Sequence, residues 1–140
     1  MAVAETTARE NLFADMFSLI NTNKLSGWTV LATFPESNPA FPCVVIHGAE
    51  VESDGLTFNR SQRDFPVTME IEVFAKAADG LEKIDQGKDN VMATIRNNQS
   101  SLYSDKIDVP TVNDTGSSQL MFNEVKINQG GLSADIRLLL

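Results

Sequence analysis

Residues 65–76 read FPVTMEIEVFAK, and their alternation sets the architecture expected for the whole chain. Side chains of different character alternate along this segment, which is the period of a β-strand buried on one face. The side chains expected on the buried face are Val67, Met69, Ile71, Val73 and Ala75. Those expected on the other face are Thr68, Glu70, Glu72, Phe74 and Lys76. A helix signal follows from Asp79, so we expect a strand that feeds a helix packed back onto the sheet.

Two helices are expected, one near the N-terminus and one in the middle of the chain. Thr7 and Glu10 have the spacing of a capping box, and the helix they start should stop near residues 21–23. Its apolar stripe comprises Leu12, Phe13, Met16, Phe17, Leu19 and Ile20. The second helix is expected to start at Asp79, with Glu82 completing another capping box. Its apolar stripe comprises Leu81, Ile84, Val91 and Ile95, and Gly87 on that stripe predicts close backbone approach to the sheet.

The remaining strands are expected before and after these helices. Alternation predicts a first strand over residues 28–34, and CVVIH at Cys43–His47 predicts a central strand covered on both faces. Ser53-Asp54-Gly55 predicts a hairpin turn, and Gly130-Gly131 predicts another between strands at 120–128 and 132–140. Between the second helix and those strands, Tyr103–Ser118 is expected to form a long loop. The order predicts one α+β domain over residues 1–140, a mainly antiparallel sheet with both helices on one face.

Composition narrows the function classes. The chain has 140 residues, and 19 Asp and Glu outnumber 11 Lys and Arg, giving a net charge of −8. That charge disfavours wrapping around nucleic acid, because phosphates require cations. Cys43 is the only cysteine, so no internal disulfide is possible and a reducing compartment is expected. No secretory signal or membrane-spanning run is expected.

The candidate catalytic residues each have a structural alternative. His47 and Cys43 lie four residues apart on one strand face, roughly 13 Å, which is too far for a catalytic pair. Glu70 and Glu72 are about 7 Å apart, a spacing that can serve glycoside hydrolysis. A solvated strand face is the favoured interpretation, and pairing with an arginine of another subunit is the alternative. We therefore expect no enzyme activity and no cofactor.

Metal binding is likewise not expected. Glu82, Asp85 and Asp89 lie along one side of the second helix, where repulsion calls for an opposing cation. Lys88 or a neighbouring subunit is expected to supply that cation in place of a metal ion. The carboxylates of the predicted long loop do not have EF-hand spacing; they are Asp105, Asp108 and Asp114.

An internal core does not account for several apolar residues. Phe74 lies among polar neighbours on the long strand. Leu139 lies on the opposite face from Ile136, Leu138 and Leu140, and the chain ends Leu138-Leu139-Leu140. An exposed apolar edge strand needs a cover. We favour a subunit interface as that cover, with an internal helix as the alternative. Arg60 and Arg63 form a local basic cluster suited to salt bridges at such an interface.

The element order resembles that of the tail terminator (tail completion) proteins of long-tailed bacteriophages. The resemblance is carried by the leading helix, FPCVVIHG at Phe41–Gly48, the Asp-Gly hairpin and FPVTMEIEVFAK. It continues through ADGLEKIDQGKDNVMATI and the final strand pair, which ends DIRLLL. It covers most of the chain as a pattern, without a short signature motif.

The resemblance implies a structural virion protein without catalysis or cofactor. Such proteins form hexameric rings that end the tail tube and present a surface to the neck proteins of the head, and DNA passes through the ring without specific binding. The implied location is the tail or neck of the virion, assembled in the host cytoplasm, with no membrane involved. The candidate interface residues are Phe74, Arg60, Arg63, Leu138, Leu139 and Leu140. The candidate ring-surface residues are Asp54, Gly55, Asp108, Pro110 and Asp114.

Two alternatives stay open. A head-completion or neck connector protein, either adaptor or stopper, is also small and ring-forming. A small ligand-binding or enzymatic α+β domain belongs to a different class and would require a polar pocket.

Overall fold

We describe the chain from a computed structural model, which covers residues 2–33, 41–48, 50–51, 64–98, 111–122 and 124–139. Within these ranges, the side chains of residues 2–9, 50–51, 64–66, 122 and 138–139 are outside the description. The helices are α1 (Ala2–Thr22), the short 3-10 helix η1 (Ala77–Asp79) and α2 (Gly80–Asn97). The strands are β1 (Thr29–Leu31), β2 (Cys43–Ile46), β3 (Glu50–Val51), β4 (Asp64–Lys76), β5 (Thr111–Phe122) and β6 (Val125–Leu139).

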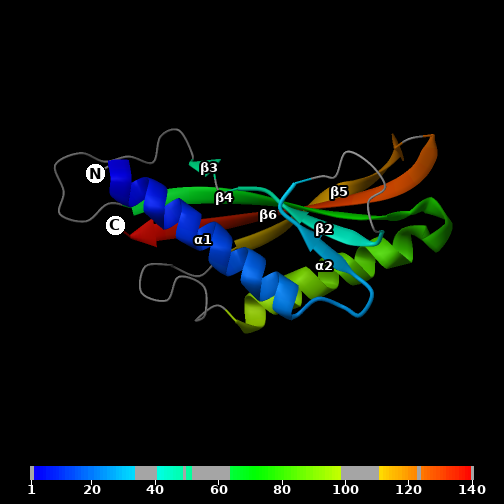
Figure 1. The fold of residues 1–140 in the computed structure, drawn as a ribbon, viewed down its shortest axis with the longest axis horizontal. Coiled ribbons are helices and arrows are strands. Elements are labelled where there is room, and N and C mark those ends of the chain that lie inside the picture. The colour runs from blue at the N-terminus through cyan, green and yellow to red at the C-terminus, as the bar shows by residue number, and fades with distance from the viewer. Residues whose placement is uncertain are drawn as a thin grey trace.

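The strands form one mixed sheet in the order β1-β2-β4-β6-β5, and β3 pairs with β4 beside that path. Only the β1–β2 pair is parallel among the pairs of the described strands. Strand β4 pairs with β6 over its whole length, from Asp64 with Leu139 to Lys76 with Ile127. The sheet with its two main helices is the predicted α+β arrangement, which is confirmed. Figure 1 shows α1 lying across the long strands, α2 running beside them and the two termini at the same end.

Both main helices pack on one face of the sheet, called here the helix face. The predicted alternation of β4 is confirmed, since Val67, Met69, Ile71, Val73 and Ala75 are all buried in one core. Helix α1 contributes Leu12, Met16 and Ile20 to this core, and α2 contributes Ile84, Val91 and Ile95. Burial of that apolar area is the main stabilising term, at about 25 cal/mol per Å². Strand β2 is buried at every position, as predicted for a strand covered on both faces.

Helix α2 approaches the sheet most closely at Gly87, as its glycine predicts. A Cβ atom at this position would lie 2.5 Å from Trp28 Cη2 and 2.6 Å from Val73 Cγ1. Such distances are well inside van der Waals contact, so the missing side chain lets the indole of Trp28 fit between helix and sheet. Glycine at this position therefore lowers the intrinsic helix propensity of α2 but permits its close packing against the sheet.

Three details of the helix predictions are wrong. Helix α1 already begins at Ala2, ahead of the capping box predicted at Thr7 and Glu10. Asp79 has helical backbone angles and makes no side-chain capping bond, because η1 leads directly into α2. Leu81 is 55% exposed and does not belong to the apolar stripe. The predicted stripe holds from Ile84 onward.

The predicted C-terminal strand pair is wrong in its turn and its extent. Gly130 and Gly131 lie within β6, and the chain passes from β5 to β6 between Phe122 and Val125. The end of the predicted loop, residues 111–118, belongs to β5. Strand β5 is therefore the edge of the sheet, and the C-terminal strand β6 lies inside it, between β4 and β5.

Candidate functional site

The most exposed element of the sheet is its edge strand β5. Every residue from Asn113 to Met121 is exposed to solvent, and β5 pairs with β6 along one side only in the described sheet. An edge strand presents unpaired backbone donors and acceptors that can pair with another chain. Charged side chains usually protect such an edge, yet Asp114 is the one charged residue in TVNDTGSSQLMF.

The end of the β5–β6 hairpin carries exposed apolar side chains. Leu120 is 40% exposed, Met121 63% and Val125 53%. Phe122, the last residue of β5, pairs with Val125, the first residue of β6. Glu124 has a φ of 66°, a left-handed conformation that a residue with a side chain adopts at a cost of about 1–2 kcal/mol. We call Leu120, Met121, Glu124 and Val125 the hairpin tip.

The charge of Asp114 is neutralised within the chain by a buried lysine. Lys88 of α2 is 4% exposed. Its Nζ donates to Asp114 Oδ1 at 2.8 Å, to the Gly116 carbonyl at 3.0 Å and to Ser117 Oγ at 2.9 Å. These three acceptors match the three donors of an ammonium group. The Lys88 bond, and secondarily the Gly116 amide bond, lower the pKa of Asp114 below its ordinary 3.8.

A β-bulge brings these acceptors onto the helix face. Asp114 pairs with Leu132 and Gly116 with Gly131, so Thr115 is the extra residue of β5. The extra residue lets Asp114 and Ser117, three positions apart, face α2 together. Gly116 has a φ of 108°, which favours glycine.

Gly130 and Gly131 leave room for this arrangement. A Cβ atom at Gly130 would overlap Lys88 Cε and Ile84 Cγ2, and one at Gly131 would overlap the Thr115 hydroxyl. The glycine pair thus lets side chains of α2 and the bulge residue Thr115 lie against β6, and it does not form a turn.

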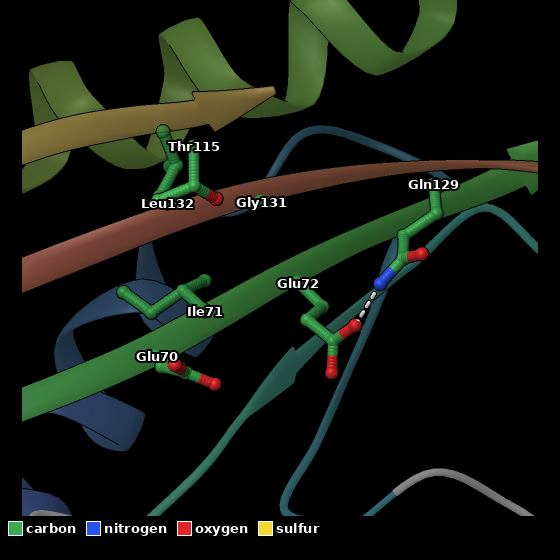
Figure 2. Close-up of a pocket in the computed structure, with 7 residues that line it drawn as sticks. All are labelled: Glu70, Ile71, Glu72, Thr115, Gln129, Gly131 and Leu132. Carbon is green, nitrogen blue, oxygen red and sulfur yellow. Dashed lines mark hydrogen bonds between the residues drawn. The ribbon is translucent and has the colours of Figure 1, made fainter. Parts of the chain in front are cut away.

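A row of polar side chains crosses the opposite face of the sheet. His47 Nε2 lies 2.5 Å from Glu72 Oε1, and Gln129 Nε2 donates to Glu72 Oε2. Ser118 Oγ then donates to Gln129 Oε1 at 3.3 Å. The row links residues that follow or belong to β2, β4, β6 and β5, and Figure 2 shows Glu72 and Gln129 pointing toward one another.

A pocket of about 200 Å³ lies beside this row. Its polar lining comprises Glu70, Glu72, Thr115 and Gln129. Both oxygens of Glu72 already accept hydrogen bonds, whereas Glu70 is exposed and available to a cation or a donor. Glu70 and Glu72 therefore lie on a solvated strand face, which is the interpretation favoured from the sequence. Among the described residues, no three His, Cys, Asp or Glu side chains gather closely enough to hold a metal ion.

An apolar cluster occupies the same face next to the row. It comprises Cys43, Val45, Phe74 and Ile127, with Leu31 and Phe41 packed against it. Burial raises the pKa of the Cys43 thiol from 9.0 to about 11, so this thiol is protonated and unreactive at neutral pH. The cluster thus has a packing role.

The structure corrects two of the predicted site residues. Phe74 is only 3% exposed, because it packs in the cluster with Cys43, so the prediction of an exposed patch there is wrong. Asp114 lies in strand β5 and not in a loop. Lys88 pairs with Asp114 and not with the acidic row of its own helix.

The other predicted site residues are not placed by the structure. Arg60, Arg63 and Leu140 lie outside the described residues, as do Asp54, Gly55, Asp108 and Pro110. Leu138 and Leu139 belong to β6 by their backbone, and their side chains are outside the description.

Sequence reasoning missed the hairpin tip and the Lys88 contact. The signal for the tip was the run Leu120-Met121-Phe122 directly before Asn123 and Glu124 in the sequence, but the glycine pair nearby gave a stronger turn signal. Nothing in the sequence separates Lys88 from an ordinary surface lysine.

No protein-family model matches the chain, and no curated protein matches it either. Within the described ranges, neither helix combines the length and the apolar character needed to cross a membrane.

Proposed function

We propose that this chain is a structural protein of a bacteriophage tail, a tail terminator that closes into a hexameric ring at the end of the tail tube. In this role it joins the tube to the neck of the head and performs no catalysis. The resemblance in element order suggests this class, and the exposed surfaces of the sheet support assembly as the mode of action.

One observation carries the proposal. Strand β5 is a twelve-residue edge, exposed from Asn113 to Met121, whose single carboxylate is neutralised by Lys88 and whose hairpin ends in exposed apolar residues. An edge of this kind favours association, because another strand or surface can satisfy its backbone groups and cover its tip.

The net charge is compatible with a ring through which DNA passes. Each copy carries a charge of −8, so a ring of copies repels phosphate at long range. DNA can then cross the opening without adhering to it.

The test is direct imaging of the purified protein. Negative-stain microscopy and native mass spectrometry over a range of concentrations should show six-fold rings, and added tail tubes should acquire a cap at one end. A protein that stays monomeric at high concentration and leaves the tubes uncapped would contradict the proposal.

The same experiments separate the alternatives. A ring that binds the portal end of a filled head and ignores tail tubes would identify a neck connector. The pocket beside Glu70 is the feature that favours a ligand-binding domain. A thermal shift with a small cationic ligand, abolished by Glu70→Gln in a monomeric protein, would support that class instead.

A further inference from the structure

We infer that copies of this chain join edge to edge, with the hairpin tip of one copy packed on the α1–β1 corner of the next. The corner is defined as residues 23–28, between α1 and β1. The occupant of each surface is thus a second copy of the chain. The choice of a second copy as the partner rests on the proposed function, whereas the two contact surfaces are identified from the structure alone.

The two edges of the described sheet are different strands. The order β1-β2-β4-β6-β5 leaves three-residue β1 at one edge and twelve-residue β5 at the other. A contact between unlike surfaces is heterologous, and repeating it generates a ring when the rotation closes. A contact between two β5 edges would instead stop at a dimer.

The strand register places the two surfaces at the same height along the strands. Thr29 pairs with Cys43, Cys43 with Phe74, Phe74 with Gln129 and Gln129 with Ser118. These five residues therefore share one row across the sheet. The corner precedes Thr29 and the hairpin tip follows Ser118, and β1 and β5 run in opposite directions. Both surfaces consequently lie at the same end of the sheet, on opposite sides of it.

Each surface offers exposed apolar area to the other. Leu25 at the corner is 36% exposed, and Leu120 and Met121 at the tip are 40% and 63% exposed. Among the described residues, the exposed large apolar side chains lie on these two surfaces with the single exception of Leu81. Burial of such side chains against each other is favourable by about 25 cal/mol per Å².

Each surface carries a charge that can pair with one on the other. Lys24 is the one charged residue between Asn21 and Leu31, and Glu124 lies in the turn at the tip. Lys126 is also exposed and pairs with Met121, so the tip presents one charge of each sign, of which Glu124 is the one suited to Lys24. Asp114 on the β5 edge is already neutralised by Lys88, so it does not repel a second acidic copy.

The local backbone supports a role for both surfaces. The corner is held rigid, since the Trp28 amide donates to the Leu25 carbonyl at 3.1 Å and Asn90 Nδ2 donates to the Asn23 carbonyl at 3.1 Å. Glu124 keeps a left-handed backbone that glycine or asparagine would adopt more readily. A strained residue that carries a charge at an exposed tip suggests that the charge is used.

The test mixes two variants that block different surfaces. Met121→Asp blocks the tip and Leu25→Asp blocks the corner, and we expect each variant alone to sediment as a monomer. Mixed in equal amounts, they should form a one-to-one dimer and nothing larger, because each copy retains one working surface. Leu81→Asp is the matched control, and it should assemble like the unchanged chain.

A charge exchange provides the second arm and does not alter apolar packing. Lys24→Glu and Glu124→Lys should each weaken assembly at least tenfold in concentration, and the double variant should recover it. Trp28 fluorescence and circular dichroism establish that every variant is folded.

The outcomes separate the inference from the proposed function. Unchanged rings in both blocked variants would overturn the inference and leave the proposed function standing. A dimer that persists in Leu25→Asp and is lost in Met121→Asp would overturn the inference in favour of a contact between like edges. The mixed variants could form a one-to-one dimer while the unchanged chain forms open filaments instead of rings. That result would support the inference and overturn the proposed hexameric ring. A chain that is monomeric under all conditions would overturn both.

Discussion

At the scale of single residues, Lys88 and Asp114 form an ion pair with unequal burial. The side chain of Lys88 is 5% exposed and that of Asp114 is 55% exposed. A charge taken out of water depends on its partners, whereas a charge in water can be solvated when its partner is lost. The two halves of the pair should therefore respond differently to substitution.

We expect Asp114→Ala to destabilise the chain more than Lys88→Met does. Asp114→Ala leaves a buried ammonium with two neutral acceptors, at a cost of about 1–3 kcal/mol in unfolding free energy. Lys88→Met keeps an apolar stem over Gly130 and leaves acceptors that water can reach, so its cost should stay within about 1 kcal/mol. Urea denaturation measures both, and equal costs would contradict the unequal burial.

The pH dependence of the same pair has a definite sign. Because the Lys88 bond lowers the folded pKa of Asp114 below its ordinary 3.8, the pair stabilises the fold above pH 3.8. That contribution is lost as the pH falls through the lowered folded value. The stability difference between the unchanged chain and Asp114→Asn should accordingly be constant from pH 7 to about pH 5 and shrink in stronger acid.

At the scale of elements, the docking of α2 on β4 depends on the absence of a side chain at one point. Gly87 lies against Trp28 and Val73, with no space for a methyl group. Helix propensity and packing therefore oppose one another at this position.

Gly87→Ala is expected to destabilise the chain despite its better helix propensity. Overpacking costs about 1–3 kcal/mol, and the propensity gain returns at most about 1 kcal/mol. Thermal denaturation followed by the fluorescence of Trp28 measures the loss and reports any displacement of the indole. Gly48→Ala is the control, since nothing lies within 4 Å of its Cβ position. A more stable Gly87→Ala would mean that α2 packs less closely than described.

The elements that could be predicted are those whose side-chain pattern has one dominant cause. Strand β4 and the stripe of α2 are set by burial against a single core, and their alternation and helical spacing survive in the sequence. The turn predicted at Gly130-Gly131 was wrong because a glycine pair can indicate either a tight turn or a close approach of other groups to the backbone. Here side chains of α2 and of Thr115 approach the two glycines. The actual turn contains Glu124 in a left-handed conformation, which no propensity rule favours.

At the scale of the whole molecule, the reactivity of the buried Cys43 thiol can report on unfolding of the chain. The thiol is fully buried beside Phe74 and Ile127, and burial raises its pKa to about 11. Reaction with a disulfide reagent requires the thiolate in contact with solvent.

We expect Cys43 in the folded chain to react with such a reagent at pH 8 at least a hundredfold more slowly than in the urea-unfolded chain. Because the folded pKa lies above the ordinary 9.0, this group also removes stability as the pH rises through about 11. Absorbance of the released thiol follows the reaction. Reaction at equal rates in both states would show that the cluster around Phe74 opens freely.

The candidate site was less predictable than the fold, because it depends on which strand ends the sheet. Phe74 stood out among polar neighbours, yet Cys43, Val45 and Ile127 from other strands bury it. Conversely, Met121 is exposed because β5 lies at the edge and the β5–β6 hairpin extends past the end of β4, and neither strand order nor relative strand length is written in any local pattern. Burial patterns are local, whereas edges are a property of the complete sheet.

The unlike edges of this sheet have a consequence for symmetry. A closed circle built by joining one edge to a different edge has a rotation axis but no twofold axes across it. Every copy then points the same way, and the upper and lower rims of the circle are chemically distinct. An object with that polarity can hold two different partners, one on each rim, without any copy changing shape.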